Sequence, residues 1–220
     1  MSRVRLAAGW SVAAMLAAGV AAAAGSGTLG FDQDTAGKPP AGLSFGRTGG
    51  GGPGQWVVRA ENDAPSPPNV LAQVDTDATD YRFPVAVADA PVAQDVKVSV
   101  KCKPVGGSVD RACGVVFRYQ DAGNYYVARA NALEDNTNLY YVKNGQRHEL
   151  AGHRGKVSSN AWHDLAVEAR GDRLQVFFDG KAIIDTHDRT FTGPGKAGLW
   201  TKADSVTYFD DLVIQPLGPS

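Results

Sequence analysis

Strict alternation of apolar and polar residues, cut by short glycine turns, limits this chain to an all-β fold. The clearest case is residues 162–180, WHDLAVEARGDRLQVFFDG. Pairing the two halves about Gly171-Asp172 gathers the apolar side chains on one face and leaves Asp164, Glu168 and Gln175 on the other. The apolar face would hold Leu165, Val167, Ala169, Leu174, Val176 and Phe178. This pattern predicts a half-buried antiparallel hairpin.

A second run of hairpins is predicted between residues 114 and 150. Residues 114–120 and 125–131 are β-branched and aromatic and flank a short turn. Residues 139–143 lead into Asn144-Gly145, a strong hairpin signal, and residues 146–150 return. If residue 116 lies opposite 127, one face carries Arg118, Tyr125, Val127, Arg129 and Asn131, and the core receives Tyr126, Ala128 and Ala130. A one-residue slip would reverse these faces.

Composition supports many short strands joined by turns. The chain has 220 residues, among them 26 glycines and 12 prolines, and no helical run stands out after the first residues. About twelve to fourteen strands are expected by this pattern, in one domain spanning residues 27–216. Two stacked antiparallel sheets bury such strands most economically.

The first 24 residues have the pattern of an export signal. A basic start is followed by the Ala-rich apolar stretch 6–20 and by three small residues at 22–24. We expect residues 1–24 to be a signal peptide and the protein to be periplasmic or secreted, the alternative being a membrane anchor. No later segment is long and apolar enough to span a bilayer. The net charge of −1 gives no attraction for nucleic acid.

The two cysteines lie on alternating strands that flank a turn. Cys102 ends one alternating run and Cys113 begins the next, so a hairpin would place them opposite each other. The spacing and an oxidising compartment favour a disulfide. Buried thiols, or a redox or metal role, are the alternatives.

The order of motifs resembles a known family. Four segments carry the resemblance, at 117–136, 144–151, 162–180 and 198–214: FRYQDAGNYYVARANALEDN, NGQRHELA, WHDLAVEARGDRLQVFFDG and GLWTKADSVTYFDDLVI. They are similar to the 3-keto-disaccharide hydrolase domain, a concanavalin A-like lectin/glucanase sandwich once called a domain of unknown function. The resemblance implies a concanavalin A-like jelly roll, often described as family 16 glycoside hydrolase-like. It also implies a hydrolase or lyase acting on keto-modified disaccharides or glycosides.

The sequence departs from family 16 enzymes at their catalytic strand. Those enzymes carry Glu-x-Asp-x-x-Glu, whereas here only Glu61-Asn-Asp63 begins such a motif and position 66 is Ser. A retaining mechanism needs two carboxylates about 5 Å apart. We therefore expect no ordinary family 16 chemistry. Any catalytic acid/base would be a different group, with Glu134, Asp135 and His163 as candidates.

Long polar and aromatic side chains on the hairpin face suit a sugar. Aromatic rings stack on sugar C–H faces, while guanidinium and amide groups bind hydroxyls. The predicted binding residues are Arg118, Tyr125, Arg129, Asn131, Tyr140, Trp200 and Lys202. The competing interpretation is that the arginines pair with carboxylates on neighbouring strands, and that Trp200 belongs to the core.

Metal sites are weakly indicated. Asp32 and Asp210 lie on the first and last predicted strands, which adjoin in many sandwiches, so a structural calcium ion is one hypothesis and solvated carboxylates the other. His187 lies between Asp185 and Asp188 and allows a metal site or a plain loop. His163 is interpreted first as a partly buried structural histidine.

Three functions remain open from the sequence. The first is an exported carbohydrate-binding domain, the second a hydrolase of 3-keto-disaccharide type, and the third a structural envelope module without a small ligand. A carboxylate or histidine with a raised pKa beside the arginines would favour the second.

Overall fold

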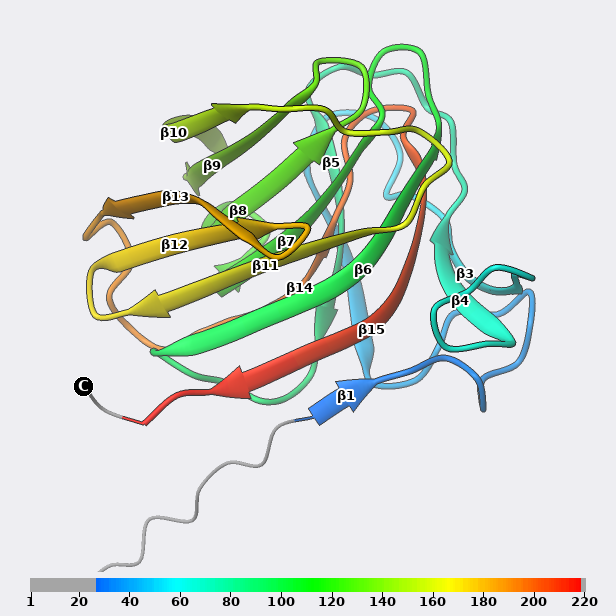
Figure 1. Ribbon diagram of the computed structural model, residues 1–220, viewed down its shortest axis with the longest axis horizontal. Coiled ribbons are helices and arrows are strands. Elements are labelled where there is room, and N and C mark those ends of the chain that lie inside the picture. Colours follow the sequence, from blue (N-terminus) through cyan, green and yellow to red (C-terminus); the bar gives the residue numbers. More distant parts are fainter. Residues whose placement is uncertain (1–26, 219–220) are drawn as a thin grey trace, which may run out of the picture.

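Two antiparallel β-sheets stack face to face in the computed structural model, which describes residues 27–218 (Figure 1). Fifteen strands and no helix occur in this range, and so no helix there is long and apolar enough to cross a membrane. The fold is the expected concanavalin A-like jelly-roll sandwich. The predicted signal peptide, residues 1–24, lies outside the described residues.

Sheet A has β15 and β6 at its centre. Its strands, in spatial order, are β13 (Lys181–His187), β12 (Arg173–Phe178), β11 (His163–Arg170), β6 (Val96–Gly106), β15 (Val206–Pro216), β4 (Asn69–Gln73) and β3 (Trp56–Ala60). The first strand, β1 (Gly27–Leu29), pairs with the last strand, β15.

Sheet B carries most of the polar side chains singled out above. Its strands, in spatial order, are β10 (Gln146–Arg154), β9 (Asn136–Lys143), β8 (Asn124–Asn131), β7 (Ala112–Asp121), β14 (Lys196–Trp200), β5 (Arg82–Ala88) and β2 (Leu43–Gly49).

The main core lies between the sheets and follows the alternation of the sequence. In the β11–β12 hairpin, Leu165 pairs with Phe178 and Val167 with Val176, which confirms the predicted register. Leu165 and Val167 are fully buried, whereas Asp164 on the other face is exposed. Each buried side chain of this size contributes about 1.5–3 kcal/mol.

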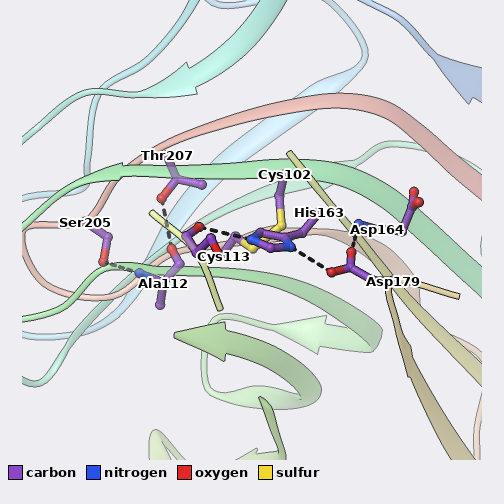
Figure 2. The surroundings of a disulfide bond; sticks show 9 residues. Cys102, Ala112, Cys113, His163, Asp164, Asp179, Ser205 and Thr207 are labelled. Atoms are coloured by element: carbon purple, nitrogen blue, oxygen red, sulfur yellow. Dashed lines mark hydrogen bonds and ion pairs between the residues drawn. A yellow bond between two sulfur atoms is a disulfide. The ribbon is translucent and has the colours of Figure 1, made fainter. Parts of the chain in front are cut away.

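The predicted disulfide between Cys102 and Cys113 is present, but it does not join hairpin neighbours. Cys102 lies on β6 of sheet A and Cys113 on β7 of sheet B, with 6.3 Å between their Cα atoms. Figure 2 shows the bridge between the sheets, with His163 of β11 beside it. Residues after β6 cross to the other sheet instead of folding back. Alternation alone does not distinguish these cases, because both place the same apolar face in the core.

The β7–β8 hairpin has the predicted register for most of its length. Val116 pairs with Val127, and Phe117 with Tyr126. A bulge then follows Phe117, and Arg118 adopts a φ of 47°. Because a bulge breaks the alternation, Arg118 does not share the face of Arg129. The sequence-based placement of Arg118 was wrong for this reason.

Candidate functional site

The outer face of sheet B is closed by its own side chains. A second apolar cluster lies on it, formed by Phe83, Val85, Val87, Ala112, Val116, Tyr125, Val127, Tyr140, Val142 and Trp200. Tyr125 and Trp200 are both 0% exposed. Both side chains belong to the buried apolar cluster. The expectation that the Trp200 ring is exposed to a ligand was therefore wrong.

Contacts between distant strands of sheet B show why this apolar cluster is buried. Arg147 of β10 places its guanidinium 4.8 Å from the ring centre of Phe83 on β5, although four strands lie between β10 and β5 in the sheet. The hydroxyl of Tyr81 accepts a hydrogen bond from the Arg147 N–H at 2.6 Å and donates one to the Gly145 carbonyl at 3.1 Å. Sheet B therefore curls until its edge strand reaches across its own concave side.

A group of hydrogen-bonded polar residues occupies one end of this curled face. We call it the polar cluster, and its members are Arg129, Glu134, Asn136, Asn138, Tyr140 and Glu149. Asn136, Asn138 and Tyr140 are alternate residues of β9, so their side chains share one face of the sheet. Arg129 of β8 pairs with Asn138, and Glu149 of β10 pairs with Tyr140. Strand pairing thus brings five of the side chains to one face, and Glu134, in the turn between β8 and β9, joins them through its bonds with Arg129 and Asn136.

Arg129 is the central group of the polar cluster. It is 3% exposed, and its Nη2 donates to the Tyr140 hydroxyl at 2.8 Å and to Glu134 Oε2 at 3.1 Å. Burial opposes its charge, but Tyr140, Asp110 and Glu134 outweigh burial and raise the pKa of Arg129. Its Nε and Nη1 are buried and have no hydrogen-bond partner within residues 27–218. Buried donors of this kind are costly unless a ligand or water accepts from them.

A hollow of about 250 Å³ adjoins the polar cluster at the β9–β10 edge. Its lining is mostly polar: Asn136, Asn138, Glu149, Gly152, His153 and Arg154. A side chain at Gly152 would fill part of it, because a Cβ there would lie 2.8 Å from Asn138 Oδ1. Asn136 Oδ1 is a buried acceptor left unpaired by the described residues. Asn136 therefore brings an unpaired acceptor to the lining of the hollow, and Arg129 is linked to that lining through Tyr140 and Asn138.

An ion-pair network adjoins the polar cluster, because the charge of Asp110 acts on Arg129. The Lys202 ammonium lies 2.7 Å from Asp80 and 2.9 Å from Asp110. Asp110 also accepts a hydrogen bond from Asn131 at 2.9 Å. Burial raises the pKa of Asp110, whose side chain is almost fully covered. Asn131 and Lys202 were both predicted as binding residues. In the structure they bond to Asp110, and Lys202 also to Asp80, so they stabilise the adjoining loops.

Arg118 lies in a different part of the molecule. It is 0% exposed, and it donates to the carbonyls of Gln94, Gly171 and Phe191 at 2.7, 2.7 and 3.0 Å. Its fourth contact is Asp95, at 3.4 Å. Arg118, on sheet B, therefore binds the turn between β11 and β12 of sheet A and the loops that contain Gln94 and Phe191.

The side chains of His163, His187 and Asp135 also bond to residues outside the polar cluster. His163 bonds to Asp179 at 2.9 Å (Figure 2). It also packs on Phe178 and bonds to the Ser158 carbonyl at 3.0 Å. The exposed His187 pairs with Asp172 at 3.0 Å. Asp135 accepts from the Val157 N–H and pairs with Lys156. Of the three acid/base candidates, Glu134 alone belongs to the cluster.

Asp32 and Asp210 hold a loop in place. Asp210 Oδ2 accepts from the Ser66 N–H and its Oδ1 from the Asp211 N–H, both at 2.8 Å, while Asp32 Oδ1 accepts from the Asn69 N–H at 3.1 Å. Oxygens facing N–H donors do not fit the oxygen-lined shell of calcium. No group of three or more metal-ligating side chains occurs in the described part of the chain. The calcium hypothesis gains no support from this arrangement.

Sequence reasoning missed part of the polar cluster. Asn136, Asn138 and Glu149 were not identified, nor was Arg147, which contacts Tyr140 of the cluster. The parity of 138 and 140 on one strand was an available signal for Asn138. The positions of Glu149 and Arg147 depend on how β10 pairs with β9 and on the curvature of the sheet. No pattern in the neighbouring sequence predicts these features.

Comparison with known proteins finds similarity in part of the sequence and in the fold. No family model matches the chain, so the resemblance to the 3-keto-disaccharide hydrolase domain stays a prediction. A segment of 89 residues is 33% identical to levanase of Bacillus subtilis (strain 168), which covers 40% of this chain and 13% of levanase. The chain thus matches only a small part of that relative's length.

Solved structures share the sandwich. The carbohydrate-binding module CBM66 from Bacillus subtilis superposes with a TM-score of 0.64 at 21% identity, over 79% of this chain and 95% of the module. The exoplasmic/lumenal domain of VIP36, in a form with Ca²⁺ and Man3GlcNAc bound, has a TM-score of 0.55 at 14% identity, over 81% of this chain and 85% of that one. At these identities the likeness concerns the fold.

Proposed function

We propose that this chain is an exported carbohydrate-binding domain, spanning residues 27–216, and that the polar cluster holds a neutral sugar. The observation that carries the proposal is Arg129, a buried guanidinium with two unpartnered nitrogens. It is bonded to the Tyr140 hydroxyl, which also accepts from Asn138, one of the residues lining the polar hollow. The likeness to a carbohydrate-binding module and to levanase supports the same class of ligand.

The charges around the polar cluster favour a neutral ligand over an acidic one. Arg129, Arg147 and Lys202 face the carboxylates of Glu134, Glu149, Asp80 and Asp110. Four carboxylates face three positive groups, so an added carboxylate would be repelled. A hydroxyl group both accepts from guanidinium and donates to carboxylate, and it therefore suits this mixed set.

A fructan is the first ligand to test, because the similar segment of sequence belongs to a levanase. The alternative activity, hydrolysis of the 3-keto-disaccharide type, is favoured by the position of Glu134 against Arg129. Glu134 is half exposed, and the pKa of its carboxyl is lowered, since Arg129 and Asn136 outweigh its partial burial. A lowered pKa suits a hydrogen-bond acceptor better than a general acid.

Titration calorimetry of the full-length chain tests the proposal. The ligands are levan, inulin, a β-glucan, a mannan and a 3-keto-disaccharide, with sugar release followed by chromatography in parallel. We expect binding without release, weakened at least about tenfold by Arg129→Ala, because a charged hydrogen bond in a buried site contributes about 1.5–3 kcal/mol.

Arg173→Ala is the matched control, because Arg173 is an exposed arginine paired with Asp185 on sheet A. It should bind as the unaltered protein does. Binding that Arg129→Ala leaves unchanged, or no binding of any sugar, would contradict the proposal. Release from the 3-keto-disaccharide alone would establish the hydrolase alternative.

A further inference from the structure

Tyr81 presents an exposed aromatic ring beside the polar cluster. Its exposed fraction is 38%, and in the described part of the chain Phe45, at 40%, is the other large aromatic residue so exposed. Tyr81 has the same parity as Phe83, so it continues the outer face of sheet B.

The ring of Tyr81 is held at both ends. It packs on Phe83, with 4.6 Å between ring centres, and its hydroxyl bridges Gly145 and Arg147 on the hairpin of β9 and β10. A ring fixed in this way loses little conformational freedom when a ligand stacks on it.

Two short chains of contacts connect Tyr81 with the polar cluster. Arg147, whose N–H bonds to the Tyr81 hydroxyl, places its guanidinium 4.6 Å from the ring centre of Tyr140. On the other side, Asp80 precedes Tyr81 and pairs with Lys202, which pairs in turn with Asp110. Tyr81 is therefore linked through Arg147 to Tyr140, which in turn accepts a hydrogen bond from Arg129.

We propose that Tyr81 forms a second sugar subsite, so that the site recognises a chain of at least two sugar residues. One residue bonds to the polar cluster, and its neighbour stacks its C–H face on the Tyr81 ring. This inference rests on the proposed function, because it specifies the length of the carbohydrate ligand.

The test measures affinity against chain length by titration calorimetry. The probes are fructose with the di-, tri- and tetrasaccharides of levan, and mannose with the corresponding mannan series. We expect the disaccharide to bind about tenfold more tightly than the monosaccharide, because stacking one sugar ring on an aromatic side chain contributes a free energy of that size. Tyr81→Ala should abolish this gain and leave the affinity for the monosaccharide unchanged.

Three further variants separate stacking from support of the fold. Tyr81→Phe keeps the ring without its hydroxyl and should keep most of the gain. Tyr81→Leu keeps apolar packing on Phe83 without a flat ring and should lose the gain even if Tyr81→Ala fails to fold. Phe45→Ala removes the comparably exposed ring that stacks on Trp56, outside the polar cluster, and should change nothing.

The outcomes distinguish this inference from the proposed function. Binding that does not increase with chain length, or that Tyr81→Leu weakens equally for all lengths, overturns the second subsite and leaves carbohydrate binding standing. No binding of any sugar by the unaltered protein overturns both.

Discussion

Arg118→Ala should destabilise the fold strongly without affecting sugar binding. The guanidinium is completely buried and donates to three main-chain carbonyls from three separate segments, at Gln94, Gly171 and Phe191. Burial lowers the pKa of Arg118, although Tyr126, Asp95 and Asp172 partly offset this effect. Truncation removes the Arg118 donors from these carbonyls and leaves the Asp95 carboxylate with the Gly171 N–H but without its positive partner.

The magnitude follows from the number of bonds lost. Each hydrogen bond to a charged donor contributes about 1.5–3 kcal/mol, but the bonds share one buried group and are not additive. Removing one partner from a buried charged arrangement typically costs about 3–5 kcal/mol, and we expect a loss in that range. For a protein of this size the melting temperature should fall by roughly 10 °C.

Urea unfolding followed by tryptophan fluorescence measures the effect. Arg173→Ala serves as the control, because its ion pair with Asp185 is half exposed on both sides and should contribute less than about 1 kcal/mol. Arg118→Lys keeps the charge but not the fork of donors, so it should recover part of the loss. A loss below about 1 kcal/mol for Arg118→Ala would refute this account of its role.

Two further predictions concern the disulfide and one loop carboxylate. The double variant Cys102→Ala with Cys113→Ala should lose about 3 kcal/mol in urea unfolding, because the bridge closes a loop with a sequence separation of 11; an unchanged unfolding midpoint would contradict this. Asp77 accepts from the Gly52 N–H at 2.7 Å and from Thr79, which lowers its pKa from 3.8 to about 2. Its stabilisation is therefore present above about pH 4 and is lost as the pH falls through about 2, so Asp77→Asn should show a smaller drop in melting temperature between these values. Equal drops in the two proteins would exclude Asp77 from the acid response.

Part of the candidate site was predictable from the sequence because it depends on local pairing. Arg129 and Asn131 share one face of a strand by parity, and the hairpin register that places them was predicted correctly at Val116 and Val127. Tyr140 follows from the same reasoning on the next strand. Trp200 shows the limit, because its aromatic character was evident but its burial depended on what lies above it.

The sequence by itself determined the strands, the hairpins at Gly171 and Gly145, and the partnership of Cys102 with Cys113, since alternation and turn chemistry act over neighbouring residues. The tertiary structure decided which sheet each cysteine belongs to and where Arg118 points, because a single bulge reverses a face and a crossover resembles a hairpin in sequence. It also decided the site itself: the curl of sheet B brings Arg147 from one edge to Phe83 near the other, and contacts across four intervening strands have no local signature.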